Sequence, residues 1–154
     1  MTQVDFYILG ENSQRQITSM VCRLCEKALA QELSVLIYVA SPADAQQMDD
    51  LLWTYKANSF IAHSSHFTQT KLNSDYFYPV FIHYPTAADK TDVVPIRDQY
   101  KQLLINLTTE IPSFFQKFTR MAEMVGKNNE EKAIARNRYR TYLQQGLSLN
   151  KYDL

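Results

Sequence analysis

The sequence contains little of what several common functional sites require. Its 154 residues include three glycines and two cysteines, and no apolar run approaches the ~18 residues of a membrane span. The N-terminus lacks the basic and then apolar pattern of a secretory signal. Acidic and basic residues number 16 each, so the formal charge is zero. A neutral chain does not favour general binding to membranes or nucleic acid, and we expect a cytoplasmic protein that meets nucleic acid only indirectly.

The scarcity of glycine argues against a phosphate-binding loop. A dinucleotide site requires G-x-G-x-x-G and a phosphate loop requires G-x-x-x-x-G-K-[ST], because backbone amides must approach phosphate oxygens closely. The turn after the first predicted strand contains Gly10 alone, followed by Glu11-Asn12-Ser13. A degenerate nucleotide-binding α/β enzyme is therefore only an alternative interpretation, and we expect no cofactor.

The cysteines and histidines do not form a pattern that binds metal or performs catalysis. Cys22 and Cys25 form one C-x-x-C pair inside a predicted helix, without the two further ligands of a zinc site or the preceding strand of a redox motif. We expect them to be buried and reduced. His63 and His66 lack an identifiable third ligand, with Asp75 the nearest guess, and no G-x-S-x-G elbow is present. We expect neither a metal site nor a catalytic centre.

Hydrophobic patterning predicts alternating strands and helices. The predicted strands are residues 4–9, 34–40, 59–63, 79–84 and 102–107. The predicted helices are residues 13–31, 42 to 53 or 55, 112–125 and 128–146. Residues 64–78 are predicted to be a loop, and residues 85–98 a connection rich in turn formers.

This order of elements predicts an α/β fold. Continuous apolar runs such as Val35-Leu36-Ile37-Tyr38-Val39 are typical of strands that are covered on both faces. Helices then pack on both sides of the sheet. We expect a three-layer α/β/α sandwich with a mainly parallel central sheet, formed by a single domain over residues 1–154.

The most informative stretch is the predicted C-terminal helix. Lys132, Arg136, Tyr139, Arg140 and Leu143 fall on one face of a helix with 3.6 residues per turn. The cations can receive carboxylates, and Tyr139 with the aliphatic stems of the arginines offers an apolar surface. Such a face suits an acidic peptide that ends in a hydrophobic residue.

Two other interpretations of this helix are open. Its cations can pair with Glu130 and Glu131 on an ordinary solvated face. Alternatively, Arg136, Arg138 and Arg140 can form a cluster that binds single-stranded DNA directly, with a strong dependence on salt.

Four segments occur together in this chain. They are Phe6-Tyr7-Ile8-Leu9, Leu51-Leu52-Trp53, Ser59-Phe60-Ile61-x-His63 and Ala135-Arg136-x-Arg138-Tyr139-Arg140-x-Tyr142-x-x-Gly146-x-x-Leu149-Asn150. In this order they resemble the chi subunit family of the bacterial DNA polymerase III holoenzyme, from one end of the chain to the other. The resemblance implies that the C-terminal helix holds the acidic, phenylalanine-terminated tail of single-stranded DNA-binding protein.

The resemblance also implies roles for individual residues of the tail site. Lys132, Arg136 and Arg140 are expected at the cationic rim, and Val125 and Tyr139 at the apolar seat. Arg136 is the expected partner of the terminal carboxylate, because a guanidinium can grip a carboxylate with two hydrogen bonds.

Four further residues complete these expectations. Gly146 is expected to allow close approach of the chain after the helix, and Trp53 to lie near the tail site. Leu143 replaces a further basic residue of the family. Phe60 is expected to contact psi, the small partner that joins chi to the clamp loader, on a side that also meets a helicase-like protein. The chain is thus expected to be a non-catalytic accessory subunit that tethers single-stranded DNA-binding protein to the clamp loader.

Overall fold

The computed structural model describes residues 2–9, 13–31, 33–54, 63–65, 80–84, 102–108, 110–112, 114–126 and 128–153. Within these ranges the chain forms strands, α-helices and one 3-10 helix. In order they are β1 (Gln3–Ile8), α1 (Ser13–Ala30), β2 (Val35–Tyr38), α2 (Pro42–Thr54), β3 (His63–Ser65), β4 (Val80–His83), β5 (Leu103–Asn106), the 3-10 helix η2 (Phe115–Lys117), β6 (Arg120–Val125), α4 (Asn129–Gln144) and β7 (Ser148–Asp153).

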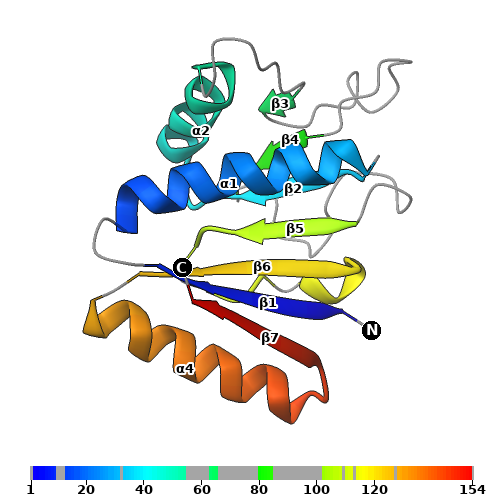
Figure 1. Ribbon diagram of the computed structural model, residues 1–154, viewed down its shortest axis with the longest axis vertical. Coiled ribbons are helices and arrows are strands. Elements are labelled where there is room, and N and C mark those ends of the chain that lie inside the picture. Colours follow the sequence, from blue (N-terminus) through cyan, green and yellow to red (C-terminus); the bar gives the residue numbers. More distant parts are fainter. Residues whose placement is uncertain are drawn as a thin grey trace.

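The strands form one sheet in the order β3-β4-β2-β5-β6-β1-β7, and every neighbouring pair is parallel. All strands therefore end at the same edge of the sheet, which lies on the left in Figure 1. Parallel strands require crossover connections, and α1 and α4 are such connections. The predicted α/β fold with a parallel central sheet is confirmed.

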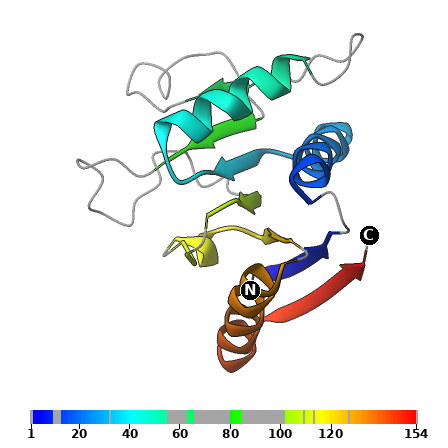
Figure 2. The ribbon, with the colours of Figure 1, turned by 90° about the vertical axis from the view of Figure 1, so that its left-hand side faces the viewer.

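Buried apolar side chains form two clusters, one on each face of the sheet. Helices α1 and α2 contribute to one cluster, and α4 with η2 contributes to the other. Figure 2 shows α1 and α4 on opposite sides of the strands. Strand β1 serves both clusters, because Val4 and Phe6 pack toward α4 and Tyr7 packs toward α1. The three layers expected from the sequence are therefore present.

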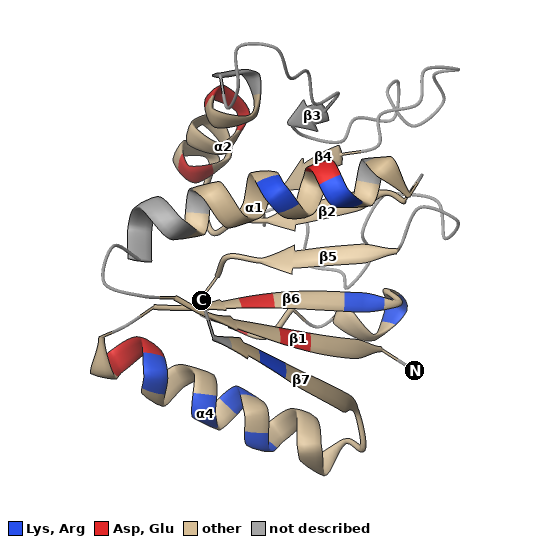
Figure 3. Cartoon of the chain, in the orientation of Figure 1, with Lys and Arg blue, Asp and Glu red and all other residues tan. Residues whose placement is uncertain are grey.

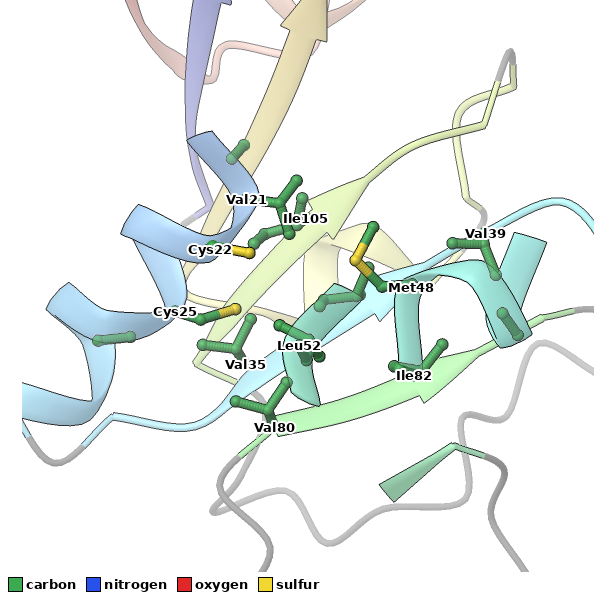
Figure 4. Packing of buried hydrophobic residues seen from close by; sticks show 14 residues of the cluster. Val21, Cys22, Cys25, Val35, Val39, Met48, Leu52, Val80, Ile82 and Ile105 are labelled. Atoms are coloured by element: carbon green, nitrogen blue, oxygen red, sulfur yellow. The ribbon is translucent and has the colours of Figure 1, made fainter. Parts of the chain in front are cut away.

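Both cysteines belong to the cluster beneath α1. Figure 4 shows the sulfurs of Cys22 and Cys25 directed toward strand residues such as Val35 and Ile105. Both side chains are fully buried free thiols. Burial raises the pKa of Cys22 to about 11 and also raises the pKa of Cys25. The thiols are therefore protonated near neutral pH, and their role is packing.

The helix predicted for residues 112–125 is wrong. The segment forms η2 and then β6, which lies between β5 and β1 in the sheet. Phe114, Phe115 and Phe118 have helical spacing and are all buried, and this spacing produced the prediction. The strand signal was hidden because Glu123, a residue type that is rarely buried, occupies a core position of β6.

The sequence also failed to predict the last strand. Residues 102–107 were expected to form it, but β6 and β7 follow β5. Of the short strand expected at 59–63, the structure describes only His63, which begins β3. The rest of the predicted loop at 64–78 and the connection at 85–98 lie outside the described residues. Among the described helices, none combines the length and the apolar character that crossing a membrane requires.

Candidate functional site

Helix α4 positions most of the cations that the sequence singled out. Its N-cap residue Asn128 accepts a hydrogen bond from the backbone N–H of Glu131 at 2.7 Å, and acidic residues in the first turn complement the helix dipole. Lys132, Arg136 and Arg140 follow at four-residue intervals, which places them on successive turns of one face. Figure 3 shows basic segments of α4 beside a basic segment of β7.

A pocket of about 410 Å³ opens between this face and the sheet. We call it the α4–β7 pocket, and the described residues that line it are Phe6, Ile8, Val125, Lys132, Ala135, Arg136, Tyr139, Arg140 and Lys151. The structure therefore brings together the five residues that were expected at the rim and the seat of the tail site. Its volume lies within the range of pockets that enclose small ligands or single side chains.

The floor of the α4–β7 pocket is apolar and aromatic. The rings of Phe6 and Tyr139 are 5.6 Å apart between centroids, at an interplanar angle of 56°. Ile8 of β1 and the buried Val125 of β6 extend the same floor. Sequence reasoning assigned Phe6 and Ile8 only to a buried strand, because it could not show that β1 lies beneath α4.

Lys151 is a lining residue of the pocket that sequence reasoning missed. It lies on β7 opposite Phe6 in the strand register, it is exposed, and its Nζ lies 4.6 Å from the centroid of the Tyr139 ring. A signal existed in the alternation of apolar and polar residues from Leu147 to Asn150, which is typical of a strand with one buried face.

The electrostatic character of the pocket is strongly positive. Four cations line it, and no acidic residue is found among its described lining residues. The side chains of Lys132, Arg136 and Arg140 make no ion pair or hydrogen bond with any described residue, and Arg136 and Arg140 are exposed. Within the described part of the chain, these cations therefore do not form the ion pairs with Glu130 and Glu131 that an ordinary solvated helix face would contain.

The opposite side of α4 has the opposite charge. A cleft of about 430 Å³ lies there, at the edge where the strands end, and we call it the carboxyl-edge cleft. Its lining includes the acidic residues Asp44, Glu123 and Glu131, and Arg138 is the one cation among its described residues. Helix α4 thus separates a basic pocket from a mainly acidic cleft.

Arg138 belongs to a buried network at the base of this cleft. Its guanidinium donates to the carboxylate of Glu123 and, at 2.7 Å, to the backbone carbonyl of Thr108. Glu123 also accepts hydrogen bonds from the Tyr142 hydroxyl at 2.7 Å and the Asn106 amide at 3.2 Å. Burial raises the pKa of Glu123, whereas the charge of Arg138 and these hydrogen bonds oppose that rise.

This network corrects one of the alternatives drawn from the sequence. Arg138 is 9% exposed and paired inside the protein, whereas Arg136 and Arg140 face solvent. Residues two apart on a helix point about 200° away from each other, so the three arginines cannot share one surface. The predicted DNA-binding cluster of Arg136, Arg138 and Arg140 is therefore wrong.

Gly146 has a different role from the one expected. Its φ is +76°, and a Cβ atom added there would meet no atom within 4 Å. The backbone N–H of Gly146 donates to Leu143 O at 3.0 Å, and that of Leu147 donates to Tyr142 O at 3.1 Å, which together form a Schellman motif. Glycine is required here by the left-handed backbone and not by a close approach of the chain.

The side chain of Trp53 lies outside the described residues, so its place near the tail site stays a prediction. Its helix α2 contacts β3 and β4 and lines the carboxyl-edge cleft together with α4. Leu143, which is 52% exposed, lies outside the described lining of the α4–β7 pocket. Phe60 falls outside the described residues.

The histidines and acidic residues give no sign of a metal site in the described part of the chain. No group of three His, Cys, Asp or Glu side chains is placed there to hold an ion. His83 is buried and packs against the rings of Tyr38 and Phe114. His66 and Asp75 lie outside the described residues.

Comparison with known proteins identifies relatives over the whole chain. The family model for the DNA polymerase III chi subunit, HolC, matches residues 1–150. The DNA polymerase III subunit chi of Pseudomonas aeruginosa is 31% identical over 154 residues, covering 100% of this chain and 98% of the relative. That of Haemophilus influenzae is 32% identical over 145 residues, covering 94% and 92%. That of Escherichia coli is 25% identical, covering 97% of each.

A solved structure shares the fold alone. The helicase domain of Hef from Pyrococcus furiosus superposes with a TM-score of 0.50 at 10% sequence identity. The match covers 85% of this chain and 28% of that chain.

Proposed function

The chain belongs to the DNA polymerase III chi subunit family, and we propose that it tethers single-stranded DNA-binding protein to the clamp loader of the replicative polymerase. In this proposal the α4–β7 pocket holds the acidic, phenylalanine-terminated tail of single-stranded DNA-binding protein, and a psi-like partner joins the chain to the clamp loader. The chain catalyses no reaction and acts in the bacterial cytoplasm at the replisome. A tether raises the local concentration of polymerase at coated template.

The observation that supports this proposal most strongly is the composition of the α4–β7 pocket. An apolar floor of Phe6, Val125 and Tyr139 suits a terminal aromatic side chain, and four cations surround it without an acidic residue in the described lining. Arg136 is exposed and has no described partner, so its guanidinium is available to a terminal carboxylate. A peptide that is acidic and ends in phenylalanine matches both features at once.

Typical free energies of the contacts in this pocket indicate that tail binding is of modest affinity and sensitive to salt. Burying a phenylalanine side chain contributes about 1.5–3 kcal/mol, and a hydrogen bond to a charged group contributes about 1.5–3 kcal/mol. Each remaining exposed ion pair contributes less than about 1 kcal/mol. The anchor and the carboxylate clamp therefore dominate the affinity, while the other cations determine how strongly salt weakens it.

Titration calorimetry with the C-terminal peptide of the organism's single-stranded DNA-binding protein tests the proposal. We expect saturable binding that weakens at least about tenfold when the terminal phenylalanine is removed, and at least about tenfold in Arg136→Ala. Lys27→Ala is the matched control, because Lys27 is an exposed cation on α1, which packs on the other face of the sheet. Equal affinities for the peptides with and without phenylalanine would contradict the proposal that the pocket binds the terminal side chain.

The contact with a psi-like partner is a separate part of the proposal. Helix α2 ends one residue after Trp53 and contacts β3, and Phe60 lies in the sequence between these two elements. We therefore assign Phe60 to the partner side, which is also the side proposed for a helicase-like protein. Phe60→Ala is expected to abolish co-elution with the psi-like partner while tail-peptide binding stays within twofold of wild type. Loss of both activities would indicate misfolding and not an interface.

A further inference from the structure

The α4–β7 pocket has cations on two opposite sides. Three of them project from α4, and the fourth, Lys151, projects from β7. Strand β7 follows α4 in the chain and pairs with β1, so the register of Phe6 with Lys151 places this lysine directly beside the aromatic floor. A ligand seated on the floor is therefore contacted by positive charge from the helix and from the sheet edge.

The ammonium of Lys151 lies over the ring of Tyr139. It lies 4.6 Å from the centroid of the Tyr139 ring, within the distance at which a cation is attracted to a ring face. The lysine is otherwise exposed, and no described acidic residue pairs with it. Holding a flexible side chain near its final position lowers the conformational entropy that binding removes.

The charge on the two sides of α4 restricts the path of an acidic peptide. On the side of α2, the described lining of the carboxyl-edge cleft includes Asp44 and Glu131, while Glu123 and Arg138 pair with each other. On the side of β7, the described lining contains cations only. Carboxylates that precede a terminal residue are repelled from the first side and attracted to the second.

We propose that a tail anchored in the α4–β7 pocket leaves it across β7, where Lys151 receives a carboxylate from one of the residues just before the terminal residue. This inference rests on the proposed function and adds the direction of the bound peptide and the residue that fixes it. An extended peptide advances about 3.3–3.6 Å per residue, so the two residues before the terminal one reach the Lys151 side of the pocket.

A double-mutant cycle between protein and peptide tests this proposal. Lys151→Met removes the charge and keeps the apolar stem over Tyr139. The second peptide replaces the acidic residues next to the terminal phenylalanine with their amides. At low salt we expect Lys151→Met to weaken binding of the acidic peptide about three- to fivefold. The affinity for the amide peptide is expected to stay within about 1.5-fold of wild type. Arg136→Ala is expected to weaken the binding of both peptides, and Lys27→Ala is expected to change the binding of neither.

Photo-crosslinking supplies an independent measurement of direction. A photoreactive residue two positions before the terminal phenylalanine is expected to label β7 at Lys151, which is exposed and lines the pocket. Labelling of α2 instead would overturn the proposal. An equal loss of affinity for both peptides in Lys151→Met would overturn it as well. If wild-type protein fails to bind the intact peptide, the proposed function itself fails, so the two failures are distinguishable.

Discussion

Two arginines on one helix show how burial decides the role of a residue. Arg136 is exposed at the α4–β7 pocket, whereas Arg138 is buried and pairs with Glu123 and with the carbonyl of Thr108. Their residue type and their helix are the same. The difference arises because a two-residue step turns the side chain to the opposite side of α4, where the sheet and the carboxyl-edge cleft replace solvent.

Arg138→Ala is therefore expected to reduce the stability of the fold, whereas Arg136→Ala is expected to reduce peptide binding. Arg138→Ala leaves the buried carboxylate of Glu123 without its cation, and it is expected to reduce the free energy of unfolding by about 3–5 kcal/mol. Arg136→Ala is expected to change it by less than about 0.5 kcal/mol while it weakens tail-peptide binding. Urea denaturation measures the stabilities. Similar, small losses in the two variants would show that the Glu123–Arg138 pair contributes little.

At the scale of elements, the turn between α4 and β7 controls the pocket. The Schellman motif ends the helix at Gly146 and returns the chain so that β7 pairs with β1 from Ser148 onward. Tyr142 and Leu147 are both buried in the same cluster, which supplies the apolar contact that accompanies this motif. The position of Lys151 beside Tyr139 therefore depends on a backbone conformation that glycine adopts without strain.

Gly146→Ala tests this dependence. A left-handed conformation costs a non-glycine residue about 1–2 kcal/mol, and we expect a loss of that size, because space is open around the added Cβ and strain is the only penalty. Gly146→Asn should lose less, because asparagine tolerates this region. Gly126→Ala is the contrasting control, since the nearest atoms to its added Cβ belong to the carboxylate end of the Glu131 side chain, which would have to shift, and no left-handed backbone is involved. Thermal and urea denaturation of the three variants would contradict the argument if Gly146→Ala were neutral.

At the scale of the whole molecule, two apolar clusters on the two faces of one sheet stabilise the fold. The cluster beneath α1 and α2 includes Cys22 and Cys25, which are fully buried (Figure 4). The other cluster includes the ring of Tyr142, which is in contact with Phe6 and Phe115. Burial raises the pKa of both thiols and of the Tyr142 hydroxyl, so both layers resist ionisation.

These pKa values predict a loss of stability in alkali. Burial raises the pKa of Cys22 from its ordinary value of 9.0, which applies to the unfolded chain, to about 11 in the fold, so between these values the folded state binds more protons than the unfolded state. Its contribution to stability is complete below about pH 9 and is lost as the pH rises toward about 11, with a limiting slope of about 1.4 kcal/mol per pH unit. Urea denaturation from pH 7 to 10.5 is expected to show a steeper decline for wild type than for Cys22→Ala. Parallel declines would contradict this assignment.

The sequence by itself determined the class of the fold and the basic face of α4. Continuous apolar runs specified β1, β2 and β4 as covered strands, and the helical spacing of apolar residues specified α1. The four-residue spacing of Lys132, Arg136 and Arg140 placed the cations on one face without any tertiary information. These signals are local, so neighbours in the sequence were enough to read them.

Only the tertiary structure decided which elements meet. The aromatic spacing around Phe115 favoured a helix, but pairing with β1 and β5 made β6 a strand, because tertiary packing outweighs local propensity. The same packing buried Arg138 and brought Lys151 of β7 beside Tyr139 of α4. Contacts between distant segments depend on strand order and on the path of the chain, and no single local pattern specifies either of them.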